Sequence, residues 1–216
     1  LGAGALAASG LDLDIAEEVA ERSLAELGIA FLFAARHHPS LGRLGPPRRP
    51  IGQRTIFNLL GPLCNPAGVT RQLIGVPSPA YVDTHIAALQ SLGAVRAMAV
   101  HGEEGLDEIS ISGPSKIALL PEGKITGARI TPEDAGLPCH DRDAIKGGDA
   151  AFNAKALRRL LAGEVSAYRD AVLFNAAGAL IVAEAARDWR EGAARAADAI
   201  DSGRAQALLD RWIDFR

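Results

Sequence analysis

Carboxylates gather in one short stretch of the sequence, directly after an apolar segment. Four of them fall within six residues, namely Glu103, Glu104, Asp107 and Glu108. Carboxylate oxygens are hard ligands of the kind that Mg²⁺ takes, commonly from one or two acidic residues together with phosphate oxygens and water. Neighbours on a strand face opposite ways, so Asp107 and Glu108 reach one ion only where the backbone departs from a regular strand. The alternative is a solvated acidic loop, which the pattern alone favours.

Positive charge and rigid turns meet at a second place. Three arginines, Arg48, Arg49 and Arg54, precede a short apolar-rich helix predicted over residues 55–60. Turn-forming residues follow that helix at Gly61, Pro62, Asn65, Pro66 and Gly68. A helix that stops on a rigid turn beside positive charge suits a small anionic ligand. The alternative is a helix–turn joint with its arginines in solvent, and the spacing alone favours it.

Two histidines, His37 and His38, follow an apolar run over residues 29–34, which predicts a strand covered on both faces. Ligands of α/β sheets bind beyond the carboxyl ends of strands, so these histidines stand where a site could form. Hydrogen bonds within a local turn are the alternative, which the residues alone favour.

A glycine pair before an aspartate also resembles a phosphate-binding loop, in Lys146-Gly147-Gly148-Asp149. The favoured interpretation is simpler. Asp149 is expected to be the N-cap of a helix over residues 150–161.

Alternating strands and helices must position these residues. Strands are expected over residues 72–76 and 96–101 with a helix over 80–92 between them, an order typical of parallel strands joined by right-handed crossovers. A hairpin is predicted over residues 116–130, around a Pro/Gly turn. Further helices are predicted over residues 1–10, 16–27 (ending at Gly28), 171–186, 187–200 and 204–212.

Composition narrows the class of protein. The 216 residues are 48% hydrophobic and 23% charged, as in ordinary globular proteins, and the formal net charge of −3 argues against a general nucleic-acid binder. No apolar run is long enough to span a bilayer, so no membrane partner is expected. The two cysteines form no motif and suit a reduced cytoplasm. The first residue is Leu1, and the sequence reads as an internal piece of a longer protein.

Two motifs resemble those of the anthranilate phosphoribosyltransferases, and the resemblance extends over essentially all of the chain. The first motif is Arg54-Thr55-Ile56-Phe57-Asn58-Leu59-Leu60-Gly61-Pro62-Leu63 followed by Asn65-Pro66, and the second is Gly105-Leu106-Asp107-Glu108-Ile109-Ser110. Cys64 departs from the family pattern, which usually has threonine or a similar small residue there.

The resemblance implies a set of binding residues. It makes Asp107 and Glu108 the ligands of Mg²⁺, with Glu103 and Glu104 outside the matched motif and solvated. It places Arg48 at the carboxylate of anthranilate, His38 near the anthranilate pocket, and Gly61 and Pro62 in the wall of that pocket. No residue is assigned as a catalytic base.

The implied reaction transfers the phosphoribosyl group of phosphoribosyl pyrophosphate to the amine of anthranilate. The products are N-(5-phosphoribosyl)anthranilate and pyrophosphate, in tryptophan biosynthesis, and the implied assembly is a cytoplasmic homodimer. The family's glycine-rich pyrophosphate loop lies N-terminal to Leu1, and Gly4 replaces the usual aspartate of a further phosphate-binding segment. The 216-residue chain alone is therefore expected to be inactive or very weak.

The implied fold is α/β and nucleoside phosphorylase/phosphoribosyltransferase-like. It has a mostly parallel central sheet flanked by helices, with part of a helical subdomain inserted. Residues 1–36 would start the α/β domain, residues 37–68 would contribute to the helical subdomain, and residues 69–216 would complete the α/β domain with its C-terminal helices.

Two other functions stay open on the sequence. A pyrimidine nucleoside phosphorylase would share the architecture and also act at a ribosyl C1, and phosphorolysis of thymidine would identify it. A non-catalytic, nucleic-acid-binding paralogue would need a basic surface stripe, which the net charge of −3 disfavours.

Overall fold

A computed structural model describes residues 3–32 and 59–216. His38 and Arg48, most of the helix predicted over residues 55–60 and the end of the strand predicted over residues 29–34 lie outside the described residues. The chain forms two compact units. Unit 1 comprises residues 1–66, 147–162 and 203–216, and unit 2 comprises residues 67–146 and 163–202. The domain boundaries expected from the sequence stay a prediction.

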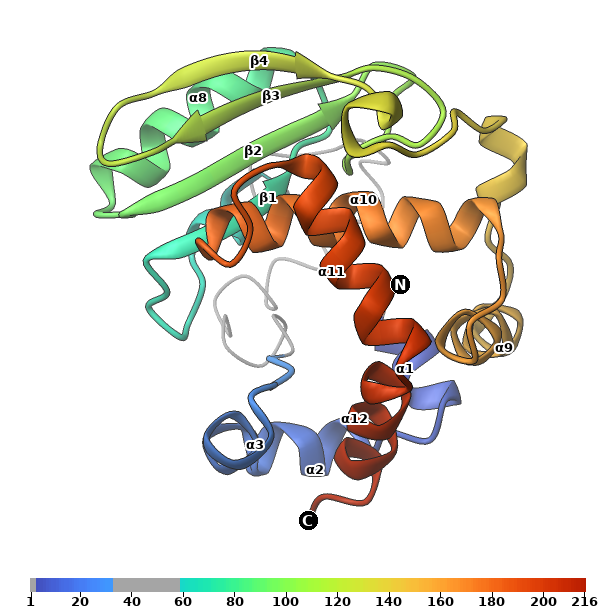
Figure 1. The fold of residues 1–216 in the computed structure, drawn as a ribbon. Coiled ribbons are helices and arrows are strands. Elements are labelled where there is room, and N and C mark those ends of the chain that lie inside the picture. The colour runs from blue at the N-terminus through green and yellow to red at the C-terminus, as the bar shows by residue number, and fades with distance from the viewer. Residues whose placement is uncertain (1–2, 33–58) are drawn as a thin grey trace, which may run out of the picture. The chain divides into compact units, whose positions relative to one another are not determined.

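Unit 2 is built on a four-stranded sheet in the order β1-β2-β3-β4 (Figure 1). The strands are β1 (Arg71–Gly75), β2 (Arg96–Gly102), β3 (Ser115–Leu120) and β4 (Thr126–Ile130). β1 and β2 are parallel and joined through α8 (Ala80–Ser91), as predicted. β3 and β4 form the predicted antiparallel hairpin.

The sheet differs from expectation in its strand directions. Among the described residues it is mixed rather than mostly parallel, because β3 runs antiparallel to β2. A parallel return requires a crossover, usually helical, of about a dozen residues or more. Residues 103–114, all of them described, contain no helix, and they carry the acidic stretch instead. The α/β class is confirmed.

Helices cover the sheet of unit 2. α8 packs along β2 and β3, and α10 (Ala167–Val182) packs along β1 and β2. α11 (Trp189–Asp201) packs on α10. α10 starts earlier than predicted because Ser166 is its N-cap, accepting a hydrogen bond from the Arg169 amide. The core of unit 2 includes the fully buried side chains of Met98, Val100 and Phe174.

Unit 1 is helical in its described part. It contains α1 (Ala3–Ala8), α2 (Leu13–Glu18), α3 (Ala20–Leu27), α9 (Ala150–Leu161) and α12 (Arg204–Ile213). The single helix predicted over residues 16–27 is divided at Val19 into α2 and α3, and Gly28 ends α3 in the left-handed conformation, as predicted. Asp149 is the N-cap of α9, with its carboxylate 2.8 Å from the Phe152 amide.

The strand predicted over residues 29–34 is not formed in its described part, residues 29–32. Ile29 and Phe31 pack instead against the buried cluster of unit 1, which consists of Leu11, Ala16, Leu157, Leu209 and Trp212. The Ser23 hydroxyl also donates a hydrogen bond to the Ile29 carbonyl. The described part of the apolar run therefore packs in the helical core of unit 1.

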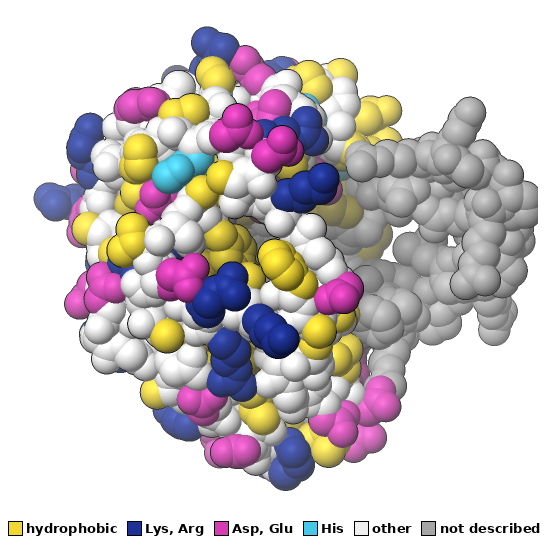
Figure 2. Space-filling view, turned by 90° about the vertical axis from the view of Figure 1, so that its right-hand side faces the viewer, with side chains coloured by type: hydrophobic (Ala, Val, Ile, Leu, Met, Phe, Trp, Pro, Cys, Tyr) yellow, Lys and Arg dark blue, Asp and Glu magenta, His cyan; other side chains and the backbone are white. Residues whose placement is uncertain are grey.

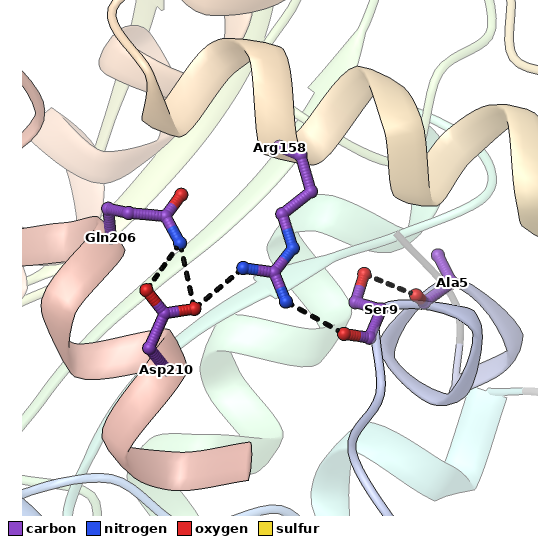
Figure 3. Close-up of polar contacts among 5 residues, drawn as sticks. All are labelled: Ala5, Ser9, Arg158, Gln206 and Asp210. Atoms are coloured by element: carbon purple, nitrogen blue, oxygen red, sulfur yellow. Dashed lines mark hydrogen bonds and ion pairs between the residues drawn. The ribbon is translucent and has the colours of Figure 1, made fainter.

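Arg158 on α9 connects three helices of unit 1 (Figure 3). Its guanidinium donates to Asp210 Oδ1 on α12 at 2.6 Å and to the carbonyl of Ser9, just after α1, at 2.9 Å. Gln206 donates to the same Asp210 carboxylate at 2.9 Å. No helix among the described residues is long and apolar enough to cross a membrane.

Candidate functional site

The acidic loop, residues 103–114, connects β2 to β3. It begins with a tight turn in which the Gly105 amide donates to the Gly102 carbonyl at 2.8 Å, and Gly105 has a φ of +99°. The Gly102 amide donates to the Leu106 carbonyl at 2.9 Å. Beyond this turn the backbone bends at Asp107 and Glu108, whose side chains are both exposed. The backbone condition under which both carboxylates reach one ion is therefore met.

α10 holds the loop from one side. The Ile109 amide donates to Asn175 Oδ1 at 3.0 Å, and Asn175 Nδ2 donates to the Ile109 carbonyl at 2.8 Å. Ile109 is itself buried, and its Cδ1 lies against Gly178 so closely that a Cβ there would come within 2.8 Å. The residue that follows the two carboxylates is therefore fixed by both its main chain and its side chain.

β1 holds the loop from the other side. A Cβ placed on Gly75 would lie 1.6 Å from the carbonyl oxygen of Asp107. No side chain fits there, so glycine at the carboxyl end of β1 allows the backbone of the acidic loop to pass directly over the strand.

A hydroxyl network fixes the far end of the loop. Ser110 is buried, its amide donates to Ser115 Oγ at 2.8 Å, and its hydroxyl donates to Glu104. The Arg142 guanidinium donates to the Glu104 carbonyl at 3.1 Å. The loop is therefore tied to β3 and to the segment after Gly136.

The structure corrects one expectation about this loop. Glu104 is not solvated. One of its carboxylate oxygens accepts from Ser110, and the other is buried without a hydrogen-bond partner among the described residues. Glu103 is exposed as expected, and it binds the Arg129 guanidinium through two contacts of 2.6 Å. Arg129 holds the pKa of Glu103 below its usual range, chiefly through that hydrogen bond.

Tyr168, in the first turn of α10, adds a polar group near the acidic pair. Its hydroxyl is buried without a hydrogen-bond partner among the described residues. Burial, followed by the negative charge of Glu108, raises the pKa of Tyr168 to about 12. The hydroxyl therefore keeps its proton at neutral pH and remains a hydrogen-bond donor close to Glu108.

Two histidines of unit 2, His101 and His140, have structural partners. His101, at the end of β2, is buried and hydrogen-bonds through Nδ1 to the Val76 carbonyl at 2.8 Å. His140 Nε2 lies 2.7 Å from Asp170 on α10, and the His140 amide donates to the Ile111 carbonyl at 2.9 Å. His140 therefore fastens its own segment to both α10 and the acidic loop.

The predicted site residues are only partly placed. Asp107 and Glu108 are brought together on one bend. Gly61 and Pro62 open the short 3-10 turn η2 (Gly61–Leu63) in unit 1 and are half-buried. Asn175, Gly75 and Tyr168 were missed by sequence reasoning. Asn175 is a polar interruption of a mostly apolar helix, which is the signal that could have found it.

The residues of the acidic loop fit a magnesium ion. Two exposed carboxylates on a bend supply hard oxygen ligands while leaving most positions for phosphate and water. The described residues contain no group of three or more His, Cys, Asp or Glu side chains placed to enclose a metal. Among the described residues, Asp107 and Glu108 would therefore bind such an ion without enclosing it.

A cavity of about 520 Å³ lies within unit 1. It is lined by Ala8, Ser9, Ala151, Ala154, Lys155, Arg158 and Arg159. Lys and Arg side chains gather on the face of the molecule seen in Figure 2. None of the predicted site residues lines this cavity, and Arg158 is already engaged by Asp210 and Ser9.

Comparisons with known proteins agree with the resemblance seen in the sequence. Residues 2–206 match the glycosyl transferase family, a/b domain. The chain is 57% identical over 211 residues to an anthranilate phosphoribosyltransferase of Novosphingobium aromaticivorans and 52% identical over 214 residues to one of Sphingopyxis alaskensis. These alignments cover 98% and 99% of the chain, which spans 64% of the length of each relative.

Solved structures show the same fold. The anthranilate phosphoribosyltransferase of Thermus thermophilus superposes with a TM-score of 0.89 at 40% identity, covering 99% of this chain and 63% of that one. The Saccharomyces cerevisiae enzyme in complex with PRPP and Mg superposes with a TM-score of 0.86 at 25% identity, covering 98% and 61%. The predicted resemblance is confirmed.

Proposed function

Because the chain belongs to the glycosyl transferase family, whose a/b domain spans residues 2–206, we propose that it performs phosphoribosyl transfer to anthranilate. The proposed donor is phosphoribosyl pyrophosphate, and the products are N-(5-phosphoribosyl)anthranilate and pyrophosphate, in tryptophan biosynthesis. The relatives with 57% and 52% identity carry that enzyme name. The enzyme name belongs to the full-length relatives, and this chain spans 64% of their length, so the activity is proposed for this chain.

The observation that carries the proposal is the bent acidic loop. Asp107 and Glu108 are exposed on a backbone that is held by β1 and α10, so their carboxylates are presented rather than buried. We assign these two side chains to Mg²⁺. The ion, when bound, neutralises charge on the diphosphate group. The chain's own contribution is to hold the two carboxylates in a fixed geometry.

The proposed reaction forms a bond between the anthranilate nitrogen and C1 of the ribose while the bond from C1 to the pyrophosphate oxygen breaks. The bonding electrons leave with pyrophosphate, and the amine gives up one proton. Such a reaction needs mainly positioning and stabilisation of the leaving group's charge. No side chain is assigned to accept the proton.

The acceptor pocket is proposed from four residues. Arg48 is assigned to the anthranilate carboxylate, since a guanidinium can bind a carboxylate with two parallel hydrogen bonds. His38, Gly61 and Pro62 are assigned to the surroundings of the ring. Gly61 and Pro62 support this assignment by standing on a short rigid turn with Pro in its first positions. A cytoplasmic homodimer is part of the same proposal.

The test is turnover of anthranilate, followed by the loss of its fluorescence in the presence of phosphoribosyl pyrophosphate and Mg²⁺, with this chain joined to the part of a relative that the alignment leaves out. Asp107→Asn and Glu108→Gln each remove a proposed ligand charge without changing shape. Each is expected to lower kcat/KM by about a hundredfold, a typical cost of losing one group that stabilises developing charge.

Glu103→Gln is the matched control, because Glu103 lies in the same loop, is exposed and is bound to Arg129. It is expected to stay within about twofold of the parent. Equal activity of all three variants would remove the magnesium assignment. Phosphorolysis of thymidine in place of anthranilate turnover would favour a nucleoside phosphorylase.

A further inference from the structure

One face of α10 is shaped to receive the acidic loop. Tyr168, Ala171, Asn175 and Gly178 are spaced three or four residues apart, so they lie along the same side of the helix. Glu108 is close enough to influence the Tyr168 hydroxyl, Asn175 binds Ile109, and Gly178 leaves room for the Ile109 side chain. This face therefore contacts the loop at Ile109, directly after the acidic pair.

Asn175 is an unfavourable residue for the middle of a helix. It lies in the middle of a mostly apolar helix, where asparagine is a poorer helix former than alanine or leucine. Its carboxamide makes three hydrogen bonds, one accepted from the Ile109 amide and two donated to the carbonyls of Ile109 and Ala171. The contact to Ala171 lies within the helix, and the two to Ile109 reach the loop. An amide that binds both polar groups of one peptide residue fixes its rotation as well as its place.

The Asn175 contacts act on the acidic pair through the backbone. The Asp107 carbonyl lies directly over Gly75, and two residues later Ile109 is held by Asn175. The backbone is thereby restrained at both ends of the segment from Asp107 to Ile109, with Glu108 between. Without the Asn175 contacts, both polar main-chain groups of Ile109 lose their side-chain partner, and the remaining restraints are the packing at β1, the buried Ile109 side chain and the hydrogen bonds of the neighbouring Leu106 and Ser110.

We propose that Asn175 is a positioning residue for a cation site, holding the Ile109 main chain so that the Asp107 and Glu108 carboxylates face one divalent ion. The inference rests on the proposed function, because it takes that acidic pair as the ligands. Asn175 itself touches neither the ion nor the substrates. Its effect is to restrict the Asp107 and Glu108 carboxylates before the ion binds, so that less conformational entropy is lost on binding.

The test is the affinity of the purified protein for Mn²⁺ alone, measured by the electron paramagnetic resonance signal of the free ion. Asn175→Ala and Asn175→Leu both remove the amide, the first leaving its space open and the second filling it. Each is expected to weaken Mn²⁺ binding at least about tenfold, the usual scale for losing a group that orients metal ligands. Amide hydrogen exchange at Ile109 is expected to accelerate in the same variants.

Asn153→Ala is a control of the same chemistry. The Asn153 carboxamide also binds both polar groups of one main-chain residue, accepting from the Gly148 amide at 3.0 Å and donating to the Gly148 carbonyl at 2.9 Å. It belongs to unit 1, and its removal is expected to leave Mn²⁺ affinity within about twofold of the parent. A loss equal to that of the Asn175 variants would overturn the proposal, since general destabilisation would then account for both.

The remaining outcomes separate this inference from the proposed function. If Asp107→Asn weakens Mn²⁺ binding and the folded Asn175 variants do not, the positioning role is wrong and the metal assignment stands. If Asp107→Asn and Glu108→Gln leave Mn²⁺ binding unchanged, the metal assignment itself fails. If neither Asn175 variant keeps the parent's helix content by circular dichroism, Asn175 is required for the fold, and the positioning role is again overturned.

Discussion

Glu184 adopts a backbone conformation that glycine usually supplies. It follows the last turn of α10 with a φ of +59°, in the left-handed region where helices commonly end on glycine. Its carboxylate accepts from Arg71 at 2.5 Å and lies 3.0 Å from Arg96, on β1 and β2 respectively. These ion pairs explain why a carboxylate stands there and offset part of the conformational cost.

The Glu184 contacts predict a dependence of stability on pH. The hydrogen bond from Arg71, with the charges of Arg96 and Arg71, holds the pKa of Glu184 below its ordinary value of 4.5. A depressed folded-state pKa stabilises the fold above the ordinary value, and the benefit is lost as pH falls towards the folded-state pKa. The difference in Tm between the parent and Glu184→Gln is therefore expected to be greatest near pH 7 and to shrink below about pH 4.5.

Glu122→Gln is the comparison for this prediction. Glu122 also has a positive φ, of 48°, and lies 3.8 Å from Arg96, but its side chain is 88% exposed. Its substitution is expected to leave the pH profile of Tm unchanged. A Glu184→Gln profile parallel to that of the parent at every pH would contradict the prediction.

Residue patterns predicted part of the candidate site and missed the rest for a physical reason. Asp107 and Glu108 could be chosen from composition and spacing, together with the requirement for a bent backbone. The roles of Gly75 and Asn175 arise from contacts with residues that are 32 and 66 positions away along the chain. A single sequence shows a glycine at a strand end and an asparagine in an apolar helix, but it does not show what each of them meets.

At the scale of elements, the close packing of α10 on α11 depends on one glycine. A Cβ on Gly192 would lie 2.7 Å from the Cα and Cβ of Ala177, so the two helices approach through a position without a side chain. Gly4 in α1 is different, because a Cβ there would meet only the Ala150 Cβ, at 3.6 Å. The two glycines therefore have opposite expectations in the same substitution.

Gly192→Ala is expected to destabilise unit 2 by about 1–3 kcal/mol, because the clash with a packed helix outweighs the gain in helix propensity. Gly4→Ala is expected to stabilise unit 1 by up to about 1 kcal/mol, since only the propensity term remains. Urea denaturation of both variants checks the pair. Stabilisation by Gly192→Ala would show that α10 and α11 can separate at little cost.

Elements with a strong local signal were predicted well. The caps at Asp149 and Gly28 and the β3–β4 hairpin follow from short-range chemistry, and the structure confirms them. The apolar run at residues 29–34 has no period that distinguishes a buried strand from a segment packed on helices. Its described part packs on helices. The direction of β3 depends on the connection before it, which apolar patterning does not report.

At the scale of the whole chain, unit 1 is assembled from three separate segments. Arg158 joins them, since it binds Ser9 from the first segment and Asp210 from the last. Arg158→Met keeps much of the apolar stem and removes these contacts. The expected loss is about 1 kcal/mol, in line with a partly exposed ion pair and one further hydrogen bond.

Hydrogen exchange locates the effect of Arg158→Met. Faster exchange is expected in α1, α9 and α12, with the strands of unit 2 unchanged, because the contacts removed all lie in unit 1. Gln206→Ala, which removes only one partner of Asp210, serves as the milder comparison. Uniform acceleration in both units would instead mean that the chain opens as a single cooperative body.

The division of unit 1 among three segments has a consequence for the order in which a newly made chain acquires its structure. The ribosome releases α1, α2 and α3 well before Leu209 and Trp212, which complete their apolar cluster. At about 5–20 residues per second the wait is on the order of 10–40 s. During that interval the whole of unit 2 leaves the ribosomal tunnel, so α1, α2 and α3 wait for the last partners of their apolar cluster until unit 2 has been made.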